Sequence, residues 1–130
     1  MTTLLARPAE DRLRSVLLLD AVVVGLSGVL LAATPSSWYG DLPGWFVRVA
    51  GVVLAVSAAD VGIASRWTGR RLRLAATVTA ELAFVWTAGV VLAAELGDVR
   101  GAGLEVLALG GLATLAFGVL ELRLVRSLPR

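Results

Sequence analysis

The chain has 130 residues, 58% of them hydrophobic, with a net charge of +2 and a mean hydropathy of +0.85. This composition excludes an ordinary soluble domain and predicts membrane-spanning helices. Histidine and cysteine are both absent, which excludes disulfides, thiol chemistry, Cys/His zinc sites and a histidine general base. We therefore expect neither a cofactor nor enzymatic activity.

Four apolar stretches follow one another along the chain, over residues 13–33, 47–64, 74–94 and 103–122. Each approaches the ~20 residues that cross a hydrocarbon layer of ~30 Å. The three connections are short, so consecutive helices are expected to pack as antiparallel neighbours. The predicted fold is all-α, an integral membrane bundle of four antiparallel helices that forms a single domain over residues 1–130.

The connecting segments and the chain ends differ in charge. Residues 34–45 combine turn-forming proline and glycine with three aromatic residues, a composition typical of a membrane interface. All twelve basic residues are arginine, and ten of them lie in the N-terminus, in the segment 66–73 and in the C-terminus. The positive-inside rule predicts that these three segments are cytoplasmic. The orientation of the chain in a lipid bilayer thus accounts for the arginines. The expected partner is the bilayer, and we expect no nucleic acid partner.

Three acids fall inside the apolar stretches, namely Asp20, Asp60 and Glu81. At ~1.5 Å per residue, Asp20 and Asp60 lie about 9 Å and Glu81 about 12 Å from the flanking arginines. An acid near the centre of a membrane helix costs roughly 2.5–3.5 kcal/mol, so we expect all three to face the bundle interior. Glu121, two residues before Arg123, is expected at the membrane interface instead.

Each of these acids has a hydroxyl residue at helical spacing on its own face, in turn Ser27, Ser57 and Thr77. Together the six residues predict a polar cluster within the membrane. Close carboxylates repel, so at least one is expected to be protonated. Two interpretations stay open: a proton-titrating or cation-binding site, or interhelical hydrogen bonds and partners for arginines that reach in from the interface.

Further packing contacts are suggested by charge and by residue size. Arg48 and Glu105 begin the second and fourth stretches and predict an ion pair in the outer leaflet, unless both lie separately among lipid head groups. Small residues repeat every four positions on the same two stretches, as Gly51, Ala55 and Ala59 and as Gly110, Thr114 and Gly118. Such stripes pack helices within one chain or between chains, so a homodimer or a larger membrane complex is possible.

Three segments carry a family resemblance: LLLDAVVVGLSGVLLAA (17–33), LPGWFVRVAGVVLAVSAADVGIASR (42–66) and TAELAFVWTAGVVLAA (79–94). They resemble the first three spans of uncharacterised small four-helix membrane proteins of actinobacteria. Asp20 matches the acid of their L-R-L-D-A opening, whereas Glu81 stands where an asparagine would precede L-A-W. The resemblance implies a four-helix fold in a bacterial plasma membrane.

These observations leave two functions to consider. The first is a small membrane protein with an accessory role, held together by its intramembrane polar contacts. The alternative is a proton-coupled transporter or channel for a small solute or a cation, which would work as an oligomer because the chain is short. Nothing in the residue pattern specifies the solute.

Overall fold

The protein is described by a computed structural model, which covers the backbone of residues 2–128 and the side chains of residues 8–128. Arg130 and the side chain of Arg7, which contribute to the predicted orientation, lie outside this range. The elements are α1 (Thr2–Ala33), η1 (Ser36–Tyr39), α2 (Gly44–Ala64), α3 (Gly69–Leu96) and α4 (Ala102–Ser127). All four α-helices are long and apolar enough to cross a membrane. The predicted all-helical membrane bundle is confirmed.

The helices extend beyond the apolar stretches from which they were predicted. Helix α1 begins at Thr2 rather than near residue 13, and α4 ends at Ser127 rather than near residue 122. The helices continue past the hydrocarbon layer because arginine and leucine, which both occur in these end segments, have high helix propensity. Arg14 also pairs with Asp11 one turn away at 2.5 Å, which supports this extension of α1. Hydropathy therefore locates the lipid-embedded part of each helix and not its ends.

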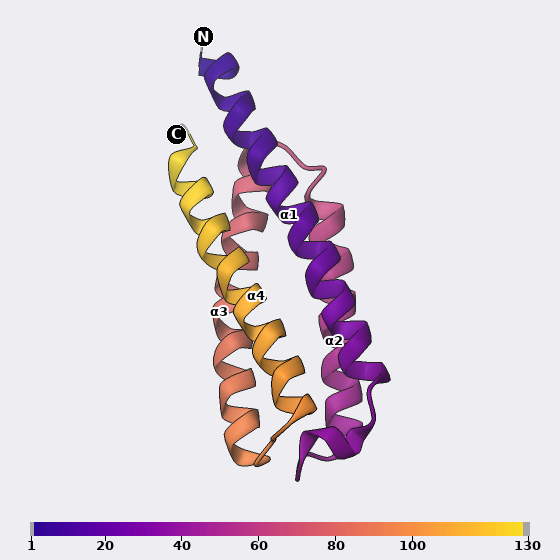
Figure 1. The fold of residues 1–130 in the computed structure, drawn as a ribbon. Helices are drawn as coiled ribbons and strands as arrows, with labels where there is room; N and C mark the ends of the chain where they lie inside the picture. The colour runs from indigo at the N-terminus through magenta and orange to yellow at the C-terminus, as the bar shows by residue number, and fades with distance from the viewer. Residues whose placement is uncertain (1, 129–130) are drawn as a thin grey trace.

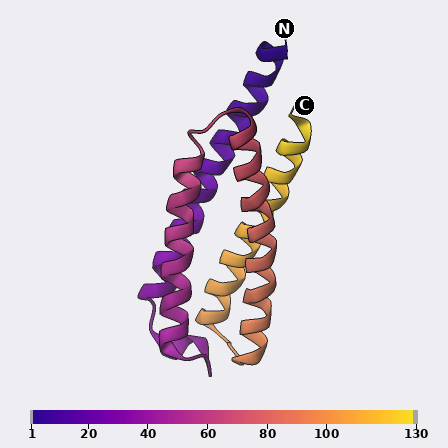
Figure 2. The ribbon, with the colours of Figure 1, turned by 180° about the vertical axis from the view of Figure 1, so that it is seen from behind.

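The two chain ends and the α2–α3 connection lie together at one end of the bundle (Figures 1 and 2). The α1–α2 and α3–α4 connections lie at the opposite end, here called the outer end. The arginine-rich segments that the structure describes are thus gathered on one side. Large apolar side chains cover the outside of the bundle, with Leu26, Val85 and Leu109 exposed by 65%, 69% and 70%. Such a surface is stable in contact with lipid and not with water.

Small residues bring the helices together in two close pairs. Gly28 of α1 packs on Gly51 of α2, where each backbone contacts the other helix directly. Gly118 of α4 packs against the methyl group of Ala83 on α3. The predicted stripes of small residues therefore serve, at Gly51 and Gly118, to pack helices within the chain.

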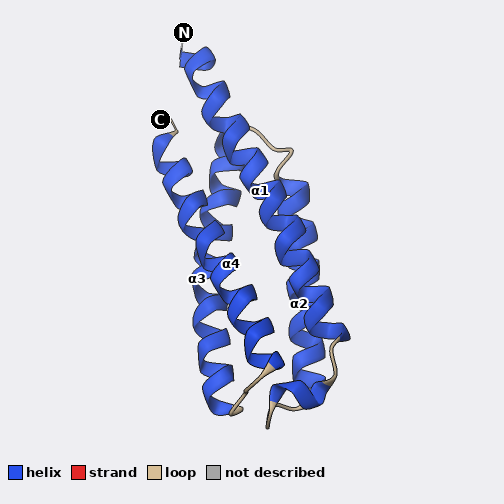
Figure 3. Cartoon of the chain, viewed as in Figure 1, coloured by secondary structure: helices blue, strands red, loops and turns tan. Residues whose placement is uncertain are grey.

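The two pairs join through α1 and α4, whereas α2 and α3 barely contact each other (Figure 3). The expectation that all consecutive helices pack as neighbours is therefore wrong for α2 and α3. Lipid tails are as apolar as leucine, so an apolar helix face gains little by packing on another one inside a bilayer. The short connection at residues 65–68 joins the helix ends and does not draw their full lengths together.

The outer end is fixed by a buried tyrosine. Tyr39 of η1 is fully buried among apolar residues, and its hydroxyl lies 2.5 Å from the hydroxyl of Thr34. The backbone N–H of Asp41 donates to the carbonyl oxygen of Gly97 at 2.7 Å, which ties this segment to the α3–α4 connection. Trp45 is exposed beside it, as expected for an aromatic residue at a membrane interface.

Candidate functional site

A cleft of about 810 Å³ separates α2 from α3. It runs nearly the whole length of these helices, from Phe46 and Ala93 near the outer end to Trp67 and Arg71 near the arginine-rich end. Alanine, valine and leucine dominate its walls. Its volume falls within the range of ~300–1,000 Å³ that is typical of ligand sites.

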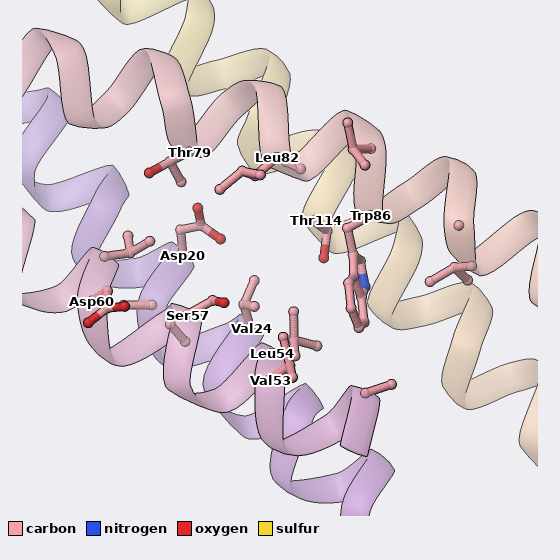
Figure 4. A pocket seen from close by; sticks show the side chains of 18 of the residues that line it. Asp20, Val24, Val53, Leu54, Ser57, Asp60, Thr79, Leu82, Trp86 and Thr114 are labelled. Carbon is pink, nitrogen blue, oxygen red and sulfur yellow. The ribbon is translucent and has the colours of Figure 1, made fainter. Parts of the chain in front are cut away.

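Asp20 lies on the floor of this cleft, which α1 and α4 form. The side chain is only 5% exposed, and its carboxyl group points into the space between α2 and α3 (Figure 4). Ser57 and Asp60 line the α2 wall, and Thr79 lines the α3 wall. Asp20 is therefore the buried acid of an otherwise mainly apolar site.

Beneath Asp20 lies a second carboxyl group, that of Glu121 on α4. Glu121 is 0% exposed, and its carboxyl group lies next to that of Asp20. Neither Oε1 nor Oε2 of Glu121 has a hydrogen-bond partner of good geometry among the described residues. A buried polar group without a partner costs about 1–3 kcal/mol. Among the described side chains, this cost falls on Glu121 alone.

The predicted acid cluster is corrected by this arrangement. Asp20 lies in the interior as expected, and Asp60 is exposed at the edge of the cleft. Glu81 is exposed and does not line the cleft, because it follows the buried Ala80 and is rotated by about 100° from it. Glu121, expected at the interface, is instead the acid that joins Asp20.

Glu121 could have been found from the spacing of small residues on α4. Gly111, Thr114, Gly118 and Glu121 follow one another at intervals of three, four and three residues, and all four are buried. This spacing defines one helix face. The nearby Arg123 suggests an interfacial depth for Glu121, but the helix face on which Glu121 lies decides its burial.

The predicted hydroxyl residues separate into two groups. Ser27 donates to the carbonyl oxygen of Val23 and Thr77 to that of Arg73, each at 2.9 Å, so both are satisfied within their own helices. Ser57 alone of the three lines the cleft. Thr79 and Thr114, which are not among the hydroxyl residues predicted from the spacing, line the cleft as well.

The predicted outer-leaflet ion pair is absent from the part of the chain that the structure describes. Arg48 and Glu105 are both exposed, and the ion pairs found there join Arg14 to Asp11 and Arg100 to Asp98. Helices α2 and α4 lie on a diagonal of the bundle, so their outward-facing side chains point apart.

The chemistry available at the site is that of a carboxyl pair in apolar surroundings. No group of three or more potential metal ligands occurs among residues 2–128, and a hard metal ion needs about six oxygen ligands. Two adjacent carboxyl groups can hold and release a proton, and an ionised one can neutralise a bound cation. No protein-family model, curated protein or solved structure matches the chain. Function is therefore inferred from the geometry of the cleft.

Proposed function

We propose that this protein carries a lipid-soluble small molecule through the α2–α3 cleft and couples its movement to a proton on Asp20. The observation that supports this most directly is the position of Asp20, a buried acid at the floor of an apolar cleft that extends along the bundle. An intramembrane acid in such a position is typical of proton relays and transport pathways. The cleft lies between two helices, so the molecule can enter from the bilayer.

The proposal includes an orientation of the chain in the membrane. The arginines at one end of the bundle favour a bacterial plasma membrane with both termini on the cytoplasmic side. Asp20 then belongs to the cytoplasmic half of the bilayer. A proton released from it would have its shorter path to the cytoplasm.

Transport is tested with proteoliposomes that enclose a pH-sensitive dye, which records proton movement when a compound is added. The compounds are an aryl amine, an aryl alcohol and an aryl carboxylic acid with the same naphthyl group. We expect at least one to change the internal pH more than it does in protein-free liposomes. Changes of internal pH equal to those of protein-free liposomes for all three would overturn the proposal.

Two matched variants connect the proton movement to the site. Asp20→Asn is expected to abolish it, because an amide cannot carry the proton at neutral pH. Glu81→Gln makes the same chemical change at an exposed acid outside the cleft and should leave the proton movement unchanged. Equal losses in both variants would show that the acid in the cleft has no special role.

A second candidate is an accessory subunit of a larger membrane complex. The open side of α2 and α3 favours it, since a partner could seat a helix along the cleft. An apolar partner helix seated there would leave the buried Asp20 carboxyl group without a polar partner, so we rank the accessory role second.

The accessory role makes its own prediction. A photoreactive residue placed at Val78, which lines the cleft, should crosslink one partner in a fixed ratio, and the same residue at Glu81 should not. Purification in mild detergent that yields this chain alone, without crosslinks at Val78, would exclude the accessory role.

A further inference from the structure

The charges around the cleft select among its possible ligands. Asp20 lies at the floor, with Glu121 next to it but outside the lining of the cleft, and Asp60 lies at the edge of the α2 wall. The basic residue that lines the cleft, Arg71, lies at its end and places its guanidinium 4.5 Å from the ring centre of Trp67. Among the described residues that line the cleft, the middle therefore holds an acid and no basic side chain.

Three ligand classes fit this site poorly. An organic anion would find no positive group to pair with in the middle of the cleft. An inorganic cation would need several oxygen ligands, and the walls are mostly apolar. A neutral hydrophobic molecule would fill the space but would make no use of the carboxyl pair. A cation with an apolar body satisfies both the walls and the floor.

We propose that the cleft binds a lipophilic organic cation, which exchanges for the proton of Asp20. This inference rests on the proposed function and names the substrate class. The cationic centre would lie at the Asp20 carboxylate and the apolar groups against α2 and α3. Trp86, which lines the cleft farther toward the outer end, offers an aromatic ring to the cation or to its substituents.

The exchange conserves charge inside the membrane. When the cleft is empty, Asp20 is a neutral carboxylic acid, because an isolated buried charge is very costly. When the cation enters, the O–H bond of Asp20 breaks, the proton leaves to water and the carboxylate pairs with the cation. Glu121 lies outside the lining of the cleft and next to Asp20, so in its protonated form it can donate its O–H to the Asp20 carboxylate. Asp20 is then the binding residue and Glu121 a positioning residue.

The experiment uses two ions of almost identical size and shape but opposite charge, tetraphenylphosphonium and tetraphenylborate. Their binding is measured by titration calorimetry on the full chain in nanodiscs of zwitterionic lipid, with empty nanodiscs as the reference. We expect tetraphenylphosphonium to bind at least tenfold more tightly than tetraphenylborate. Repeating the titration in buffers of different ionisation heat should give close to one proton released per cation bound.

The pH dependence provides a second readout. A one-for-one exchange weakens tetraphenylphosphonium binding about tenfold for each pH unit of acidification while Asp20 is protonated in the free protein. Asp20→Asn should remove both the proton release and this pH dependence. Glu81→Gln should change neither, since Glu81 lies outside the cleft.

The proposal is overturned in wild-type protein if the two ions bind equally, if neither binds, or if tetraphenylphosphonium binds without proton release. These outcomes do not depend on whether the Asp20 variant folds. They are also separable from the proposed function. Protein-dependent proton movement with the aryl alcohol or the aryl acid, together with no preference for the phosphonium ion, would leave transport standing and refute the cationic substrate.

Discussion

Gly28 and Gly51 face each other where α1 crosses α2, and the contact is reciprocal. A Cβ atom on Gly28 would lie 2.6 Å from the carbonyl oxygen of Gly51, and a Cβ on Gly51 would lie 2.6 Å from the carbonyl oxygen of Gly28. Real Cβ atoms essentially never approach backbone oxygen so closely. The pair therefore sets the distance between α1 and α2, the most extensive helix contact of the bundle.

Gly51→Ala should destabilise the protein by about 1–3 kcal/mol, because the added methyl group forces the two helix backbones apart. The free energy of unfolding can be measured by SDS titration in mixed micelles. Gly89→Ala is the matched control, since a Cβ there meets no atom within 4 Å. Alanine is a better helix former than glycine, so the control should be neutral or gain about 0.5–1 kcal/mol. Equal effects at both positions would contradict the close crossing.

The outer end depends on a second close contact, between Gly103 and Trp38. A Cβ on Gly103 would overlap the carbonyl oxygen of Trp38, so Gly103→Ala should displace η1 from the start of α4. We expect faster proteolysis within residues 34–43 and a loss of about 1–3 kcal/mol. Gly110→Ala lies on the same helix with its nearest neighbour at 3.9 Å and should show neither effect.

The hydroxyl pair of Thr34 and Tyr39 gives a smaller and more specific prediction. Tyr39→Phe removes one hydrogen bond from a buried site and should cost about 0.5–1.5 kcal/mol. Thr34 still donates to the carbonyl oxygen of Leu31 in this variant. In a double-mutant cycle with Thr34→Val, the two losses should add up to more than the loss in the double variant. Simple additivity would show that the hydroxyl groups do not stabilise each other.

Much of the fold can be predicted from the sequence because hydropathy and arginine placement act over whole segments. The number of spans, their order and the shared end of the termini all follow from them. The pairing of helices is harder to predict, since inside lipid it depends on individual small residues such as Gly28 and Gly118. The gap between α2 and α3 leaves no mark in hydropathy, because a lipid-facing wall and a helix-facing wall have the same composition.

Only part of the site could be predicted from the sequence, for a similar reason. An acid in an apolar helix is unexpected, which identifies Asp20 from sequence. Its depth in the membrane is similar to that of Asp60 and Glu81, which groups the three. Depth alone does not give the direction of a side chain around its helix. Glu81 and Glu121 exchange roles once the buried faces of α3 and α4 are followed residue by residue.

The proposed orientation can be tested by single cysteine substitutions without first removing a native cysteine, since the chain has none. Thr68 is exposed in the α2–α3 connection, and Ser37 is exposed in η1 at the other end of the bundle. Each is replaced by cysteine in a separate variant. In intact cells, a membrane-impermeant maleimide should label the Ser37 variant only. Labelling of the Thr68 variant in its place would reverse the topology.

The last prediction separates a structural role of the carboxyl pair from a functional one. Glu121→Leu replaces an unpartnered buried carboxyl group with an apolar side chain of similar size, so stability should stay equal or rise by about 1–3 kcal/mol. If the pair instead held α1 to α4 by hydrogen bonding, the same variant would lose stability. The unfolding free energy of Glu121→Leu thus decides the question that Asp20 raises in the sequence. A gain in stability, combined with altered pH dependence of cation binding, would show that the acids are retained for the ligand and not for the fold.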